Sequence, residues 1–167
     1  MVAIVVILAA TLSVFALGFT EEATQPGPIV GQSSGDLVPQ DGSDDGIVRI
    51  NHVAGDTVQV TNMEVVVDAS DACGKQGRLV NLPVPSSGND IDQSNIAGAD
   101  IFDQRPYGFD AVPGPNAIHR SEYPAGEQIA FRITGGPCPI NQGDEITVRV
   151  IHTPTNSVVI KETLTAS

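Results

Sequence analysis

The sequence predicts a hydrophobic N-terminal α-helix joined to an antiparallel, immunoglobulin-like β-sandwich. Three observations lead to this fold class: a charge-free apolar stretch over residues 1–19, a Gly- and Pro-rich stretch over residues 20–46, and short strand patterns with turn signals over residues 47–167. No segment after residue 19 shows the period of an amphipathic helix. The 167 residues have room for one ordinary domain with an appendage.

The helix is predicted because residues 1–19 carry no charge, and Thr11 and Ser13 are their polar side chains. A 19-residue helix rises about 28 Å, close to the thickness of the hydrocarbon core of a bilayer. Apolar groups on every face of this helix require apolar surroundings on all sides. Three interpretations follow: a secretory signal, a membrane anchor with an external domain, and an assembly helix that packs against copies of itself. A secretory signal is disfavoured because the first cation of the chain is Arg49.

Residues 20–46 predict a linker with room for a brief edge strand, because Pro, Gly, Ser and acidic residues dominate there. Apolar and alternating runs then predict strands at 47–52, 57–60, 63–67, 78–84, 128–134, 145–152 and 157–164. Pro83 and Pro85 place the fourth of these strands at a sheet edge. Hairpin turns are expected at 53–56 and 153–156. Residues 86–122 are expected to form a long irregular loop, with one helical turn within 94–103.

The two cysteines, Cys73 and Cys138, most simply form one disulfide if the domain is extracellular. Such a bond would close a loop of about 65 residues and stabilise the fold by about 4 kcal/mol through chain entropy. Two free buried thiols are the alternative. Neither cysteine belongs to a CxxC pair, so a metal site is not expected.

The formal net charge is −12, from 20 acidic residues against 8 Lys and Arg. This balance excludes ordinary nucleic-acid binding and argues against docking on anionic lipid through basic clusters. An excess of carboxylates over cations favours a halophilic protein, since salt screens the self-repulsion. An ordinary acidic protein is the alternative.

No catalytic, cofactor-binding or metal-binding residue is predicted, and the chain is not expected to be an enzyme. His52, His119 and His152 lack metal-ligand spacing and are interpreted as surface or hairpin-packing residues. Residues 41–46 resemble the opening of a calcium loop, but its twelfth position is His52 rather than Glu, so a solvated acidic linker is favoured. A nucleophile elbow and a phosphate-binding glycine loop are both missing. Four aromatic residues are interpreted as core or subunit-packing side chains: Phe102, Tyr107, Phe109 and Tyr123.

Residues 1–19 read MVAIVVILAATLSVFALGF, which resembles the hydrophobic segment of archaeal type IV pilins, especially those of haloarchaea. Three further stretches resemble the strands of pilin head domains: residues 47–56, 123–131 and 143–154. Together with residues 1–19, these stretches amount to 50 of the 167 residues. The basic leader and the Ser-Pro and Gly segment that precede the helix in this family do not precede residues 1–19, so the leader-cleavage site is left open.

The resemblance implies a structural subunit of an extracellular archaeal type IV pilus. Such a subunit waits in the membrane, then polymerises with copies of itself into a filament that adheres to surfaces and other cells. Small residues in the segment permit close helix approach. The assembly-helix residues expected to make these contacts are Val2, Ala3, Val6, Ala9, Ala10, Ser13, Phe15, Ala16 and Gly18. The main alternative is a monomeric membrane-anchored extracellular β-sandwich binding domain, and a secreted enzyme with an uncleaved leader ranks third.

Overall fold

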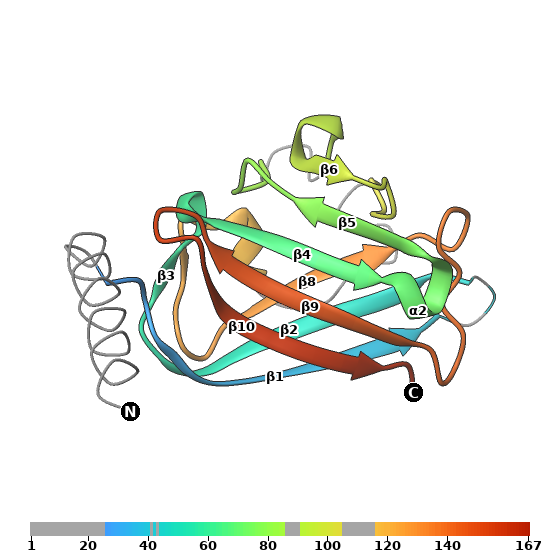
Figure 1. The fold of residues 1–167 in the computed structure, drawn as a ribbon, viewed down its shortest axis with the longest axis horizontal. Coiled ribbons are helices and arrows are strands. Elements are labelled where there is room, and N and C mark those ends of the chain that lie inside the picture. The colour runs from blue at the N-terminus through green and yellow to red at the C-terminus, as the bar shows by residue number, and fades with distance from the viewer. Residues whose placement is uncertain (1–25, 41, 43, 86–90, 105–115) are drawn as a thin grey trace, which may run out of the picture.

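The computed structural model describes residues 26–40, 42, 44–85, 91–104 and 116–167, which form two facing antiparallel β-sheets and a short third sheet (Figure 1). The strands are β1 Val30–Pro39, β2 Gly46–Gly55, β3 Val58–Gln59, β4 Met63–Ala69, β5 Lys75–Leu79, β6 Ile96–Gly98, β7 Glu122–Tyr123, β8 Gln128–Ile133, β9 Glu145–His152 and β10 Ser157–Thr165. One sheet has the order β1-β2-β8, the other has the order β10-β9-β4-β5-β6, and β3 pairs with β7. The short helices are the 3₁₀ turns η1 Val60–Asn62, η2 Gln93–Asn95 and η3 Ala117–His119, and the α-helix α2 Ser70–Cys73.

One hydrophobic core lies between the two sheets. Alternate residues of a strand point to opposite faces, so every second residue of β4 and β9 is buried. The inward side chains of the five-stranded sheet include Met63, Val65, Val67, Ile146, Val148 and Val150. They belong to the same core cluster as Val48, Ile50, Ile129, Phe131 and Ile133 of the three-stranded sheet. The intervening residues of β4 and β9 therefore lie on the outer face of the five-stranded sheet.

The order of the strands corresponds to that of a variable-type immunoglobulin domain, in which a G-F-C-C′-C″ sheet faces a sheet that contains A-B-E. Leu37 of β1 also forms a parallel bridge to Ala166, directly after β10. Two hallmarks of antibody domains are different: the sequence has no Trp, and the disulfide does not join the central strands of the two sheets. The likeness is therefore one of topology.

β1 is a ten-residue strand within the stretch that was expected to be a linker. It pairs with β2 along its length, from Val30 opposite Gly55 to Pro39 opposite Gly46. A Cβ atom at Gly35 would lie 2.8 Å from Leu164 Cδ2, so glycine lets this strand approach the core closely. The predicted linker over residues 20–46 allowed a brief edge strand. The structure has an edge strand there, but it is ten residues long, so the β-domain begins well before residue 47.

The predicted fold class is wrong as a description of this structure. Its first element, the hydrophobic helix over residues 1–19, lies outside the described residues. Within the described residues, the α-helix is the four-residue α2. Most of the other elements are antiparallel strands, in which alternate residues are buried. No helix in that part of the chain is long and apolar enough to cross a bilayer. In the part of the chain that the structure describes, the fold is β-rich and antiparallel and contains no long helix.

The expected loop over residues 86–122 contains regular structure where it is described. The 3₁₀ turn η2 comes slightly earlier than the expected helical turn and is capped by Asp92, whose carboxylate accepts a hydrogen bond from the backbone of Ser94. Strand β6 then pairs with β5, which begins and ends before the strand expected at 78–84. Asn116 anchors the end of the loop, because its side-chain amide bonds both the N–H and the C=O of Ala130 in β8. The loop therefore extends one sheet and covers part of the other.

Candidate functional site

The chain approaches β1 at one end of the sandwich, where residues 26–29 are held by two turns. The backbone N–H of Ile29 donates to Asp56 Oδ2 at 3.0 Å, and the backbone N–H of Asp56 donates to Ile29 O at 2.8 Å. A Cβ atom at Gly27 would lie 2.8 Å from Thr155 Oγ1 in the β9–β10 turn, so glycine permits this close approach. We call these four residues the N-terminal junction. It links the chain that follows residues 1–25 to both sheets.

The β9–β10 turn is held by a short chain of hydrogen bonds. His152 Nδ1 lies 2.8 Å from Thr155 Oγ1, which lies 2.6 Å from Ser157 Oγ. Within the described part of the chain, no carboxylate is hydrogen-bonded to His152, so these residues do not form a Ser-His-Asp arrangement. His152 is half-buried and packs the hairpin, in keeping with its sequence interpretation.

A second histidine, His52, is buried between the sheets beside Tyr123. His52 Nδ1 lies 3.1 Å from the carbonyl oxygen of Tyr123, and the two rings meet edge to face at 5.3 Å. The Tyr123 hydroxyl donates to Ile50 O at 2.7 Å. Burial raises the pKa of Tyr123 well above its ordinary value. A backbone hydrogen bond from Ile129 opposes this rise, and the nearby Glu162 carboxylate adds a smaller increase. Tyr123 is therefore a neutral hydrogen-bond donor in the core, as expected for a packing aromatic.

The third histidine and the calcium-like stretch form no metal site with other described residues. His119 Nδ1 lies 3.2 Å from Val84 O, far along the chain from the other histidines. In residues 26–40, 42, 44–85, 91–104 and 116–167, no three His, Cys, Asp or Glu side chains lie close enough to hold a metal ion. Of the calcium-like stretch 41–46, residues 41 and 43 lie outside the described residues. Asp44 lines a shallow hollow of about 380 Å³ together with Ile140 and Gln142.

Asp45 is not part of a solvated linker, as the sequence suggested, but belongs to a buried ionic cluster around Arg132. Arg132 lies on β8 with its side chain 8% exposed. Its guanidinium is 3.2 Å from Asp103 Oδ2 and 3.8 Å from Asp45 Oδ2. Asp45 also accepts a hydrogen bond of 2.6 Å from the backbone N–H of Gly135. This cluster fixes the loop after Ile101 against the outer side of the three-stranded sheet.

Cys73 and Cys138 form a disulfide, which confirms the pairing expected from the sequence. The bond joins the end of α2 to the loop between β8 and β9, across a sequence separation of 65 residues. Lys75 reinforces the same connection, because its Nζ donates to Pro137 O at 2.7 Å.

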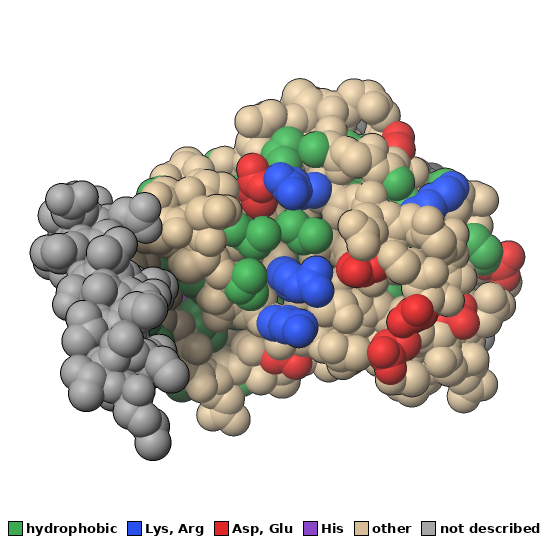
Figure 2. All heavy atoms as spheres, in the orientation of Figure 1, with side chains coloured by type: hydrophobic (Ala, Val, Ile, Leu, Met, Phe, Trp, Pro, Cys, Tyr) green, Lys and Arg blue, Asp and Glu red, His purple; other side chains and the backbone are tan. Residues whose placement is uncertain are grey.

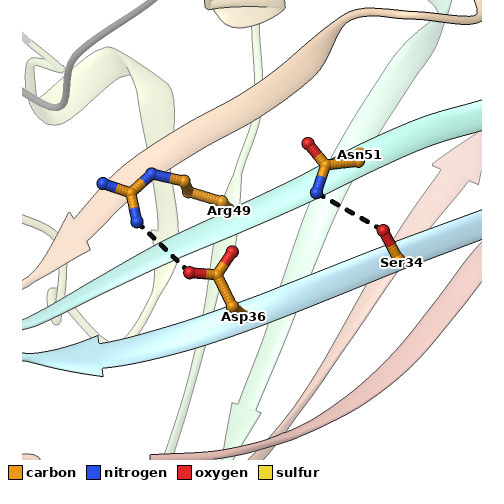
Figure 3. Close-up of polar contacts among 4 residues, drawn as sticks. All are labelled: Ser34, Asp36, Arg49 and Asn51. Carbon is orange, nitrogen blue, oxygen red and sulfur yellow. Dashed lines mark hydrogen bonds and ion pairs between the residues drawn. The ribbon is translucent and has the colours of Figure 1, made fainter. Parts of the chain in front are cut away.

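The exposed face of the three-stranded sheet carries matched polar pairs across β1 and β2. Asp36 lies directly opposite Arg49, with Oδ2 3.2 Å from Nη1, and Ser34 lies opposite Asn51 (Figure 3). The Asn51 side-chain amide donates to Ser34 Oγ at 3.4 Å. Each polar group on this part of the face therefore meets a complementary group on the next strand.

The exposed face of the five-stranded sheet is different, because cations line up across it. Lys161 of β10 lies directly opposite Arg149 of β9, which lies opposite Val66 of β4, which in turn lies opposite Arg78 of β5. Figure 2 shows a row of Lys and Arg side chains on the face formed by β5, β4, β9 and β10, with hydrophobic side chains beside the row. We call Arg78, Arg149 and Lys161 the basic row. The row has no signal in the sequence alone, because a bulge between Val158 and Ile160 sets which residues of β9 and β10 lie opposite each other.

The predicted assembly residues, from Val2 to Gly18, lie outside the described residues, as do Tyr107 and Phe109. Phe102 and Tyr123 are in the core, as expected. No protein-family model matches the chain, and no curated protein is significantly similar to it. Function is therefore inferred from the residues and their geometry.

Proposed function

We propose that this chain is a structural subunit of an extracellular filament of the archaeal type IV pilus kind. In this proposal, subunits wait in the membrane and then associate through the apolar residues 1–19, while the β-domain forms the outside of the filament. Contacts between copies are head-to-tail, so they propagate rather than close. Adhesion of the filament to surfaces and other cells, and a saline habitat, belong to the same proposal.

The observation that carries this proposal is the N-terminal junction. A 19-residue segment without a charged side chain precedes an acidic β-domain in the sequence. Ile29 and Asp56 exchange two backbone-mediated hydrogen bonds, and Gly27 packs against Thr155 in the opposite turn. Tension on the apolar segment would therefore pass into both sheets, as is required of a subunit that transmits tension along a filament.

The test is negative-stain electron microscopy of filaments sheared from cells that produce the full chain. An antibody against residues 30–167 should decorate thin filaments along their length. The double variant Ala9→Asp/Ala10→Asp should abolish these filaments, because two carboxylates in an apolar contact must be desolvated.

A matched control adds the same two charges at exposed positions of the β-domain, as Gln32→Glu/Thr61→Glu, and should leave the filaments intact. Antibody confined to membrane vesicles, with no filament decorated, would contradict the proposal and favour a monomeric membrane-anchored binding domain.

A further inference from the structure

The basic row concentrates three of the eight Lys and Arg residues of the chain on one sheet face. Lys161 and Arg149 are directly opposite on neighbouring strands, where like charges destabilise a sheet. On a chain with 20 acidic residues, an opposite carboxylate would be the ordinary partner. The arrangement is therefore unfavourable for the isolated subunit, which indicates that an acidic group from outside the subunit completes it.

The described carboxylates on the same face form no ion pair with Arg149 or Lys161. Glu64 pairs with Arg78, with Oε2 3.1 Å from Nη1. Asp68 accepts two hydrogen bonds from Ser70, from Oγ at 2.6 Å and from the backbone N–H at 3.1 Å. The pKa of Asp68 is lowered mainly by its hydrogen bonds from Ser70 and to a smaller extent by the charge of Arg149. Among the described residues, no carboxylate oxygen lies within 4.0 Å of Arg149 or Lys161. Two positive charges therefore remain available to a partner.

The surroundings of the row favour a protein partner over a polyanion. Val66 and Ile151 are half-buried on the same face, and Val158 is 52% exposed. Apolar side chains beside cations suit a folded surface that brings both carboxylates and apolar groups.

The same chain offers a complementary surface at the end of the sandwich away from the N-terminal junction. There β1 and β4 end and β9 begins, and three exposed carboxylates occur on Asp44, Asp71 and Glu145. We call these three residues the acidic end. Figure 2 shows Asp and Glu side chains gathered towards this end of the face. We infer that the basic row binds the acidic end of a second copy of this chain.

This inference rests on the proposed function and deepens it, because it names the contact between β-domains. Two copies paired through the same face would place cations against cations, so a symmetric dimer is disfavoured. Within one copy, Glu145 and Arg149 are four residues apart on β9, so their backbone positions are separated by about 13 Å. The acidic end of a copy therefore does not neutralise the basic row of the same copy. The contact must therefore join different surfaces of successive copies, and such contacts extend into a filament.

Zero-length carbodiimide cross-linking tests the contact, because it joins a lysine amine to a carboxylate that touches it. The chain has two lysines, Lys75 and Lys161. Treated filaments of the full chain should give covalent dimers and larger multimers on a denaturing gel, and these species necessarily join separate copies. Mass spectrometry of the dimer should link the peptide of Lys161 to a peptide that contains Asp44, Asp71 or Glu145.

Matched variants separate the effect of the positive charge from the effect of the lysine amine that the carbodiimide cross-links. Lys161→Arg keeps the charge and should keep the filaments while losing the cross-link, whereas Lys75→Arg should keep both. Arg149→Glu/Lys161→Glu should reduce the sedimented filament mass by about tenfold or more, and adding Asp71→Lys/Glu145→Lys to that variant should restore it. Unchanged filaments in Arg149→Glu/Lys161→Glu would overturn the inference. So would binding to phosphatidylserine vesicles through these residues without any Lys161 cross-link.

The outcomes also distinguish this inference from the proposed function. If the wild-type chain forms no filaments, the proposed function fails, and the cross-link is then sought in the membrane fraction. Multimers joined through Lys161 in that fraction would support the docking contact alone. Their absence would overturn both.

Discussion

The exposed faces of the two sheets arrange their charged residues in opposite ways. On the three-stranded sheet, Arg49 faces Asp36 across β1 and β2 at 3.2 Å (Figure 3). On the five-stranded sheet, Lys161 faces Arg149 across β10 and β9 (Figure 2). Cross-strand complementarity is the ordinary way in which a sheet face stabilises itself. A face that lacks it is better suited to a partner than to the isolated fold.

The difference extends to the other arginine of the three-stranded sheet. Arg132 on β8 is buried against Asp45 and Asp103, whereas Arg149 on β9 is half-exposed. Removing one partner of a buried ion pair strongly destabilises the fold, whereas removing an exposed charge has little effect on stability. The two sheets therefore use the same side chain for different purposes, one to fix the fold and one to meet another molecule.

The largest expected effect comes from comparing Arg132→Gln with Arg149→Gln. Removing the buried guanidinium leaves two carboxylates close together, and should lower the free energy of unfolding by about 3–5 kcal/mol. Arg149→Gln should change it by less than about 0.5 kcal/mol. Urea denaturation of the full chain in detergent measures both variants. Equal changes in the free energy of unfolding would show that Arg132 does not stabilise the fold more than Arg149 does, which would contradict the comparison of the two faces.

An intermediate effect on stability is expected at Tyr123, which lies in the core between the two sheets. Tyr123→Phe removes the hydrogen bond to Ile50 O and should cost about 1 kcal/mol at neutral pH. The raised pKa of Tyr123 means that the native state holds this proton more tightly than the unfolded chain. Its contribution is complete below about pH 10 and is lost as the pH rises beyond that value. Thermal unfolding between pH 8 and pH 11 should therefore show a steeper alkaline loss in the wild type than in Tyr123→Phe, and parallel curves would refute this assignment.

The smallest effects are expected from exchanging the charge patterns of the two faces. Asp36→Lys places like charges opposite each other on the three-stranded sheet and should destabilise the fold by about 0.2–1 kcal/mol. Lys161→Glu creates an opposite-charge pair with Arg149 and should stabilise the fold by a similar amount. Melting temperatures at low salt measure both changes, which should shrink at high salt. A Lys161→Glu variant that unfolds earlier than the wild type would remove the argument that the basic row opposes folding.

Much of the strand pattern was predictable from local sequence. Strand β9 has the bounds expected at 145–152, and the turn at 153–156 leads into β10. These elements were identifiable because apolar and polar residues alternate and because Asn156 suits a positive φ, observed at 51°. The Cys73–Cys138 pairing followed from the cysteine count.

Other features depended on contacts that are distant in sequence. β1 contains few apolar residues and resembles a linker locally, but β2 supplies its hydrogen bonds and the core accepts Leu37. Arg132 is an ordinary strand residue in sequence, and only the folding of residues 45 and 103 beside it creates a buried ionic cluster. Long-range pairing of this kind leaves no periodic signal within a single segment.

The sequence by itself determined which residues alternate, where the turns occur and how strongly acidic the chain is, because these are properties of neighbouring residues and of composition. Tertiary structure decided the register. Without the bulge between Val158 and Ile160, the pairing of Ser157 with His152 would place Lys161 opposite Val148. Val148 and Ile160 must both point into the core, so the bulge shifts the strand by one residue and brings Lys161 opposite Arg149. The demand for a buried core thus created the basic row on the opposite face.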